Sequence, residues 1–259
     1  MKPINISFAG AGRVGTALCK EMYKAGFNIE TVVSLSRLNG ESLARACMAS
    51  WSTELIFPDS TDILIVTVPD QKLNEVLNNI VCNPQTLVVH TAGSIGINEF
   101  PEHIAKKGVF YPLQTFSKDR KVNFQDLPFL LEASDEISLK LLKNLAETLG
   151  GVTHYADSGN RRMIHLAAVF ICNFTNHMLT EGNDIASKAG FSFDLLVPLL
   201  NETILKAREI GPSRAQTGPA VRNDQITIQK HIELLSSSPD VQRIYNEITK
   251  SIIQYHKKL

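Results

Sequence analysis

Short apolar runs alternate with amphipathic segments along the chain as far as residue 155, and beyond it the strand signals stop. This alternation is typical of a parallel sheet whose faces are covered by helices. It predicts strands over residues 4–9, 29–36, 53–56, 62–68, 86–91, 109–111, 129–132 and 152–155. We therefore predict a doubly wound, mainly parallel α/β domain over residues 1–155.

Helical periodicity fills most of the gaps between these strands and nearly all of the remaining chain. In the first domain it predicts helices over residues 16–25, over residues 39–50 with Asn39 as the cap, and from residue 97 or 98 to residue 107. Beyond it, helices are predicted from Asp157 or Ser158 to Ala189 and over residues 193–210, 224–237 and 240–257. Gly-Pro pairs at residues 211–212 and 218–219 interrupt this part. The sequence thus predicts an all-helical C-terminal domain over residues 156–259, which we expect to bind substrate and to dimerise.

The first predicted strand runs directly into Gly10-Ala11-Gly12-Arg13-Val14-Gly15, a G-x-G-x-x-G turn that a helix follows. The first glycine permits the tight turn, the second lets backbone N–H groups approach a pyrophosphate, and the third lets the helix pack closely on the strand. The start of the helix adds the positive end of its dipole. The turn therefore predicts a Rossmann dinucleotide site, against the alternative of an ordinary glycine-rich connection.

The end of the second predicted strand indicates which dinucleotide binds. In a Rossmann domain, an acidic residue there favours NAD, whereas an arginine accommodates the 2′-phosphate of NADP. The strand ends with Ser36-Arg37 and carries no acid. Arg37 can pair with a phosphate through its planar guanidinium group, and Ser36 offers a hydroxyl group. We predict NADP as the cofactor; an exposed arginine without a ligand is the alternative.

Three further strand ends carry polar or glycine-containing turns at the edge where ligands of open α/β sheets bind. From the first two we predict cofactor contacts by Val68 and Pro69 and by Thr91-Ala92-Gly93. For the substrate we predict Ser94 and, from the third turn, Gln114. Loops are polar in any case, so for each residue a purely structural role is the alternative.

The long helix that opens the second domain is apolar nearly all round between residues 163 and 179, which implies burial against several neighbours. His165 and Asn173 interrupt this surface. They are spaced a little over two helical turns apart, which places them on one face. Buried polar groups need hydrogen-bonding partners, which a ligand in a cleft between the two domains would provide. The alternative is a polar pair satisfied within the core.

Arg222 lies just after the Gly218-Pro219 turn and is a candidate for binding a substrate carboxylate, because a guanidinium group binds carboxylates at two points. Asp224 is well placed to cap the helix that follows. A local cap and ion pair between these two residues is the alternative to a substrate contact.

The composition narrows the partners of the protein to small molecules and other proteins. Lysine plus arginine and aspartate plus glutamate number 26 each in 259 residues, so no net charge favours nucleic acid or an anionic membrane.

The longest strictly apolar run, residues 166–172, is far shorter than the ~20 residues of a membrane span. The four cysteines form no C-x-x-C pair, which suits free thiols rather than a metal site. With a strand beginning at Ile4, no room remains for a signal peptide, and we expect a cytoplasmic protein.

Five segments together resemble a bacterial family of NADP oxidoreductases whose substrate is undefined, and the resemblance covers essentially the whole chain. They are residues 10–15, 68–70, 90–94 and 111–116, and residues 217–219 with Arg222 and Asp224. The resemblance implies a Rossmann domain followed by a helical domain, as in pyrroline-5-carboxylate reductase, ketopantoate reductase and the β-hydroxyacid dehydrogenases. Such proteins usually dimerise through the helical domain, so it also implies a homodimer.

One departure from this resemblance concerns the proton donor. The β-hydroxyacid dehydrogenases carry a catalytic lysine on the long helix, whereas this chain has no lysine between Asn160 and Ser187. His165 is the candidate in its place, because imidazole titrates near neutral pH. We expect an NADP-dependent oxidoreductase that transfers a hydride to or from a small oxo, hydroxy or imine compound, with Asn173 positioning the substrate. A dinucleotide-binding regulatory protein or sensor without turnover is the alternative.

Overall fold

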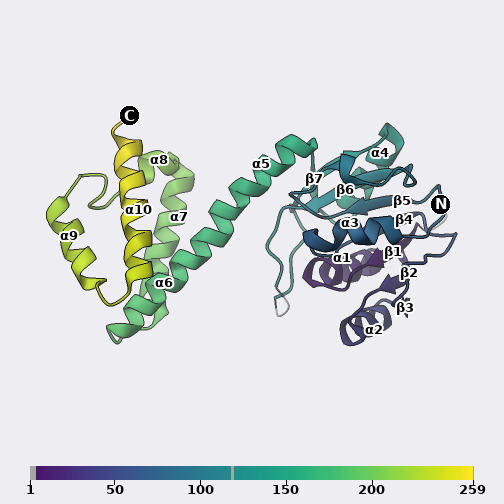
Figure 1. Ribbon diagram of the computed structural model, residues 1–259, viewed down its shortest axis with the longest axis horizontal. Coiled ribbons are helices and arrows are strands. Elements are labelled where there is room, and N and C mark those ends of the chain that lie inside the picture. Colours follow the sequence, from purple (N-terminus) through teal and green to yellow (C-terminus); the bar gives the residue numbers. More distant parts are fainter. Residues whose placement is uncertain (1–3, 118–119, 259) are drawn as a thin grey trace. The chain divides into compact units, whose positions relative to one another are not determined.

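A computed structural model describes residues 4–117 and 120–258 of the chain, which divides into two compact units, Met1–Asn173 and Phe174–Leu259 (Figure 1). The strands end at Tyr155, where the sequence changes from alternating to purely helical patterns. The first unit also includes the helical residues from Ser158 to Asn173.

The first unit is built on one eight-stranded sheet with the order β3-β2-β1-β4-β5-β6-β7-β8. Its strands are β1 (Asn5–Ala9), β2 (Asn28–Val33), β3 (Ser50–Ser52), β4 (Ile63–Val66), β5 (Leu87–His90), β6 (Lys107–Pro112), β7 (Pro128–Ala133) and β8 (Val152–Tyr155). Every pairing is parallel except that of β6 with β7. The predicted mainly parallel Rossmann fold is therefore confirmed, and the carboxyl ends of β1, β4, β5 and β6 share one edge.

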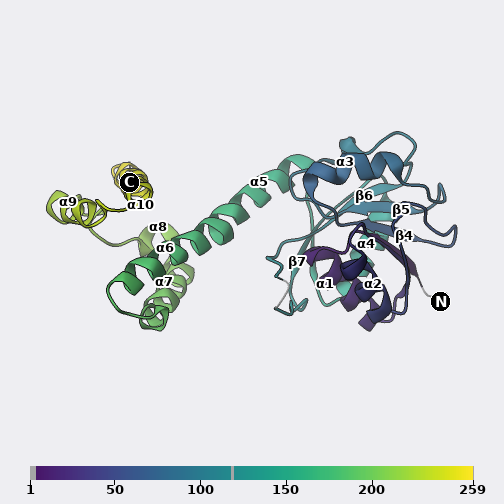
Figure 2. The same ribbon diagram turned by 60° about the horizontal axis from the view of Figure 1, so that its bottom comes forward.

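Helices cover both faces of the sheet (Figure 2). On one face, α1 (Arg13–Lys24), α2 (Arg37–Ala46) and α4 (Glu136–Thr148) contribute side chains to one apolar cluster. On the other face, α3 (Asp70–Asn79) contributes Leu73 and Leu77 to a second cluster. The middle strands β4 and β5 are buried along their whole length, as expected for parallel strands between two helical layers.

The long helix after β8 has three parts, α5 (Ser158–Ala168), the π-helical segment η2 (Val169–Phe174) and α6 (Thr175–Lys188). Asp157 caps its start by accepting a hydrogen bond from the Asn160 N–H group at 2.7 Å. The second unit continues with η3 (Phe193–Leu196), α7 (Val197–Ile210), α8 (Pro212–Ala215), α9 (Gln225–Leu234) and α10 (Pro239–His256). The predicted all-helical C-terminal region is confirmed.

Several predicted elements are wrong in position or kind. The strand predicted at residues 53–56 is replaced by β3, which lies just before it. The second helix begins at Arg37 rather than Asn39, because the Ser36 hydroxyl group caps it, and it ends at Ala46. The helix predicted from residue 97 or 98 to residue 107 is reduced to the single turn η1 (Ile97–Glu99). Pro101 follows that turn, and proline removes a backbone donor that a helix would need.

The expected burial of the long helix is contradicted in the single chain. Met163, Leu166 and Ile171 are 66%, 49% and 76% exposed, respectively. The second unit is also thinly packed, since its buried residues, within the part that the structure describes, are Ala220, Ile228 and Thr249. No helix within residues 4–117 and 120–258 is long and apolar enough to cross a membrane.

Candidate functional site

The glycine-rich turn between β1 and α1 is shaped by close contacts with Thr67, which follows β4. Gly10 has a φ angle of +113°, which a residue with a side chain rarely adopts. A Cβ atom on Gly15 would lie 2.5 Å from the Gly10 carbonyl oxygen, so only glycine fits there. A Cβ atom on Gly12, in contrast, would meet nothing closer than the Thr67 carbonyl oxygen at 3.9 Å. The packing of the protein thus explains Gly10 and Gly15 but not Gly12.

The start of α1 is suited to an anion. Gly12 precedes the helix and supplies no side-chain cap, so the first N–H groups are not engaged by a cap. A cavity of about 800 Å³ borders this start and the first turns of α2. Its basic lining residues are Arg13, Lys20, Lys24, Arg120 and Lys121, and its one acidic lining residue, Glu21, pairs with Lys24 at 2.7 Å. The size and charge of this cavity fit a phosphorylated ligand of dinucleotide class.

The two residues predicted to recognise the 2′-phosphate lie at the start of α2. The Ser36 hydroxyl group accepts a hydrogen bond from the Asn39 N–H group at 3.4 Å and acts as the helix cap. Arg37 has a side chain that is 78% exposed, with Nε 3.2 Å from Glu41 Oε2. Its guanidinium carbon lies 5.9 Å from the centre of the Trp51 ring. Arg37 is thus held over an aromatic face and remains accessible to an anion.

The turns after β4 and β5 meet at the carboxyl edge of the sheet. Val68 and Pro69 lead into α3, which begins at Asp70. The Ser94 hydroxyl group donates a hydrogen bond to the Asp70 carboxylate. Ser94 is therefore already engaged by a side chain of its own unit, although its oxygen retains acceptor capacity. The Thr91 N–H group donates a hydrogen bond to the Val66 carbonyl oxygen at 3.2 Å, so the backbone just after β5 still pairs with β4.

Gly93 lies beneath two polar rings that come from other elements. A Cβ atom on it would be 2.7 Å from His165 Nδ1 and 2.9 Å from Tyr111 Cζ. His165 comes from α5 and Tyr111 from β6, and the Tyr111 hydroxyl oxygen lies 3.0 Å from His165 Nδ1. The structure therefore brings two predicted site residues, Gly93 and His165, into contact. Ala92 and Gly93 are buried, whereas Thr91 before them and Ser94 after them are partly exposed.

The charge of Tyr111 is controlled by its surroundings. Burial raises the pKa of the Tyr111 hydroxyl group above its usual value, and the negative charge of Asp70 raises it further. The positive charge of Arg161 acts in the opposite direction. At neutral pH the phenol is therefore protonated and can donate a hydrogen bond.

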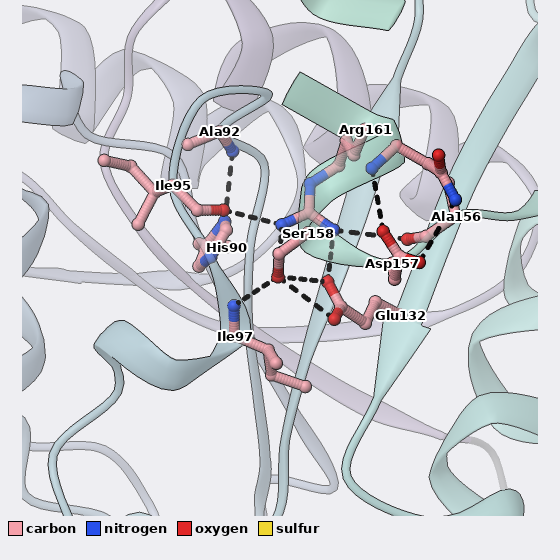
Figure 3. Close-up of polar contacts among 10 residues, drawn as sticks. His90, Ala92, Ile95, Ile97, Glu132, Ala156, Asp157, Ser158 and Arg161 are labelled. Atoms are coloured by element: carbon pink, nitrogen blue, oxygen red, sulfur yellow. Dashed lines mark hydrogen bonds and ion pairs between the residues drawn. The ribbon is translucent and has the colours of Figure 1, made fainter. Parts of the chain in front are cut away.

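A buried ion pair anchors the first turns of α5 to the sheet (Figure 3). The Arg161 side chain is completely buried, and its guanidinium group pairs with Glu132 of β7. It also donates a hydrogen bond to the Ile95 carbonyl oxygen at 2.6 Å. The Ser158 hydroxyl group contacts the same carboxylate and accepts a hydrogen bond from the Ile97 N–H group at 3.0 Å. This cluster joins β7, α5 and the loop that carries Gly93.

His90, at the end of β5, is a buried structural residue. Its Nδ1 atom accepts a hydrogen bond from the Ala92 N–H group at 3.2 Å, and its ring stacks on Phe100. Burial, followed by the charge of Arg161, lowers the pKa of His90 to about 3, with a smaller opposing effect from the Gly96 backbone. His90 is therefore neutral at physiological pH and serves to shape the turn over residues 91–93.

No contact with the Tyr111–His165 pair is observed for Gln114 or Asn173 among the residues that the structure describes. Gln114 is exposed, and its side-chain oxygen accepts a hydrogen bond from the Thr115 N–H group at 2.8 Å. Asn173 is exposed and lies in η2. The shared helix face predicted for Asn173 and His165 stays a prediction.

Arg222 belongs to the second unit and is exposed there. Asp224 caps α9 by accepting a hydrogen bond from the Thr227 N–H group at 3.1 Å. Hydrogen bonds from the Thr227 N–H group and the Thr227 hydroxyl group hold the pKa of Asp224 below its usual value, and the charge of Arg222 lowers it by a smaller amount. The structure thus supports the local role predicted for Asp224, while substrate binding by Arg222 stays a prediction.

Sequence reasoning did not assign roles to Arg161, Glu132 and Tyr111. Spacing is the one signal that the sequence offers. Arg161 and His165 lie four residues apart and therefore share a helix face, and Arg161 on that face is buried. No cluster of three or more histidine, cysteine, aspartate or glutamate residues suited to a metal ion occurs in the part of the chain that the structure describes.

Comparisons with known proteins cover both units. Residues 2–115 match a family described as a Rossmann-like domain, and residues 127–252 match a domain of unknown function, DUF2520. No curated protein matches the chain. The crystal structure of a "putative NADP oxidoreductase" from Bacteroides fragilis shares 40% sequence identity and has a TM-score of 0.92, with 97% of this chain and 98% of that chain covered.

Two more distant solved structures share the fold. A protein from Thermotoga maritima is 21% identical, with a TM-score of 0.69 and 98% of each chain covered. A reductive aminase from Aspergillus terreus, in complex with NADPH and ethyl-5-oxohexanoate, is 14% identical, with a TM-score of 0.71. That comparison covers 98% of this chain and 95% of the aminase. At these identities the likeness concerns the fold alone.

Proposed function

With its Rossmann-like and DUF2520 domains, this chain belongs to the family of the Bacteroides fragilis protein, and we propose that it is an NADP-dependent oxidoreductase. It would transfer a hydride between the nicotinamide and a small oxo, hydroxy or imine compound. The observation that carries the proposal is the position of the Tyr111–His165 pair, which lies at the same carboxyl edge of the sheet as the glycine-rich turn, with β4 and β5 between them. A phosphate site and a polar proton-transfer pair on one edge are what hydride transfer to a polar double bond requires.

The residues of the turn fit a dinucleotide. Gly12 has open space where a side chain would stand, and the cavity beside it carries basic side chains. In the proposal, residues 10–15 hold the pyrophosphate, Ser36 and Arg37 hold the 2′-phosphate, and the turns at residues 68–69 and 91–93 border the nicotinamide half. When bound, NADPH supplies the hydride.

The protein then supplies the proton and the orientation. His165 donates a proton to the oxygen or nitrogen atom of the substrate, either directly or through water. Ser94, Gln114 and Asn173 are the proposed polar contacts to the substrate, with Arg222 for a carboxylate group. The general oxidoreductase assignment rests on the family, whereas these individual roles are proposals.

The proposal is tested by NADPH oxidation against a panel of small oxo acids, aldehydes and imines. His165→Ala is expected to lower kcat by about 100-fold or more, because positioned general acids contribute that much. The matched control is His177→Ala, which removes a histidine that is 53% exposed and lies 3.5 Å from Glu181. Turnover unchanged in His165→Ala would remove His165 from the mechanism.

The cofactor preference is tested at Arg37. Arg37→Ala is expected to weaken NADPH binding by about 10- to 100-fold and to leave NADH binding unchanged, since a charge-assisted bond contributes about 1.5–3 kcal/mol. Arg45→Ala serves as the control, because Arg45 pairs with the same Glu41 at 3.1 Å from the far end of α2. Titration calorimetry with both cofactors gives the answer, and equal losses for NADPH and NADH would contradict the assignment.

A second candidate function is a dinucleotide sensor without turnover. The observation in its favour is the lack of a lysine between Asn160 and Ser187 that could donate a proton to a substrate. Arg161 does not replace it, because its guanidinium group is buried in the ion pair with Glu132. This candidate predicts tight NADPH binding with no oxidation by any member of the panel.

We also propose a cytoplasmic homodimer formed through the helical region. The apolar residues Leu199, Ile204 and Leu205 of α7 are 65%, 51% and 50% exposed, respectively. Their exposure supports the proposal that a second copy of the chain covers this surface of α7. Sedimentation is expected to give twice the chain mass of 28.6 kDa, and a monomer at micromolar concentration would contradict the dimer.

A further inference from the structure

The hydrogen bond between Tyr111 and His165 joins two elements that are far apart in the sequence. The hydroxyl oxygen and Nδ1 are 3.0 Å apart, and the two rings meet edge to face with their centres 5.9 Å apart. Tyr111 lies one residue before the end of β6, and His165 lies two turns into α5. Because the bond engages Nδ1, Nε2 is the nitrogen that it leaves open for another partner.

The backbone at Gly93 supports both rings. Each ring occupies space that a side chain on Gly93 would fill, with His165 Nδ1 and Tyr111 Cζ at 2.7 and 2.9 Å from the position of such a Cβ atom. The Arg161 ion pair holds α5 against β7 one helical turn before His165. The imidazole ring is therefore constrained on the side of its Nδ1 atom by Tyr111 and by the Gly93 turn.

Burial, followed by the charge of Asp70, favours a protonated phenol at Tyr111. Asp70, at the start of α3, places a negative charge near Tyr111, and the positive charge of Arg161 is paired with Glu132. The Tyr111 hydroxyl oxygen accepts a hydrogen bond from Nδ1–H of an imidazolium, and it still accepts one from the Nδ1–H tautomer that remains when Nε2 loses its proton. The hydrogen bond thus persists in both charge states of His165.

We propose that Tyr111 is a positioning residue, whose hydroxyl group holds His165 so that Nε2 is the nitrogen that delivers the proton. This inference rests on the proposed oxidoreductase function. In the reductive direction, the Nε2–H bond of the imidazolium breaks as an O–H or N–H bond forms on the substrate. The carbon beside that atom takes the hydride from NADPH, which leaves NADP⁺ and a neutral imidazole. His165 then takes up a new proton from the bulk solvent at Nε2, so that each turnover consumes one solvent proton with one NADPH.

The first test is made on the unliganded protein and needs no substrate. Tyr111→Phe keeps the ring and removes only the hydroxyl group, so the ¹⁵N resonance of His165 Nδ1 is expected to move. Tyr245→Phe is the matched control, because the Tyr245 hydroxyl oxygen lies 2.9 Å from His231 Nδ1 in the second unit. That variant is expected to move the His231 resonance and to leave His165 unchanged. An unmoved His165 resonance in Tyr111→Phe would overturn the proposal.

The second test separates positioning from a merely structural role. Tyr111→Phe is expected to lower kcat by about 10- to 100-fold, because misplacing a catalytic group has effects of that size, while the NADPH dissociation constant stays unchanged. Introduced into His165→Ala, the same change is expected to have no further effect. An equal loss in both backgrounds would show that Tyr111 acts independently of His165 and overturn the inference. Absence of NADPH oxidation in the wild-type protein would instead overturn the proposed function, while the resonance shift would still report the hydrogen bond.

Discussion

Gly12→Ala is expected to weaken NADPH binding by about 100-fold, which corresponds to about 2.7 kcal/mol, while the unliganded protein remains folded. The methyl group meets no protein atom closer than 3.9 Å, so the fold has room for it. It would stand where the pyrophosphate approaches the start of α1. The change at a helix N-cap is expected to cost about 1 kcal/mol or less in the free energy of unfolding. Calorimetric titration and thermal unfolding measure the two quantities separately.

Gly15→Ala is the matched comparison. Its Cβ atom would lie 2.5 Å from the Gly10 carbonyl oxygen, a backbone atom that cannot move aside easily. This variant is expected to lose about 1–3 kcal/mol of stability or more from overpacking. The contrast between the two alanines distinguishes a ligand site from a structural turn. NADPH binding that survives unchanged in Gly12→Ala would mean that the pyrophosphate does not lie against this turn.

Arg161→Ala is expected to destabilise the protein by about 3–5 kcal/mol, because it removes a completely buried charge and leaves the Glu132 carboxylate, which is 16% exposed, without its ion-pair partner. The loss also frees the Ile95 carbonyl oxygen and so loosens the loop that carries Gly93. Removal of the Arg161 charge is expected to raise the pKa of His90 from its lowered value. Urea unfolding measures the stability.

Arg162→Ala is the control, since Arg162 is the next residue of α5 and is exposed. It is expected to change the stability by about 0.5 kcal/mol or less. Replacing both members of the ion pair, as Glu132→Leu with Arg161→Met, is expected to restore much of the stability lost in Arg161→Ala. Equal stability of Arg161→Ala and the wild-type protein would show that the pair is not buried in solution.

The sequence predicts well those parts of the fold that are specified by residues close together in the chain. The glycine-rich turn is contiguous, and its spacing specifies the turn, the close approach and the packing in one short segment. The strands β1, β4 and β5 were predicted close to their observed bounds, because buried parallel strands are short apolar runs. The Asp224 cap was also predicted, since capping is local.

The parts that could not be predicted depend on tertiary contacts. Tyr111 and His165 are 54 residues apart in the sequence, and Glu132 and Arg161 are 29 apart, so no local pattern joins either pair. The π-helical segment at residues 169–174 interrupts a periodicity that the sequence shows as regular. The wrong start of α2 arose because the second strand was extended to Ser36, which placed the observed cap inside a strand.

The central claim is that this protein transfers a hydride from NADPH with His165 as the proton donor. Its most direct test is the fate of deuterium from NADPH labelled at the transferable C4 position, followed by mass spectrometry of each product of the oxo acid, aldehyde and imine panel. The wild-type protein is expected to place deuterium on the former carbonyl or imine carbon of at least one compound, and His165→Ala is expected to slow this transfer by about 100-fold or more. Tight NADPH binding with no deuterium in any product would contradict the claim.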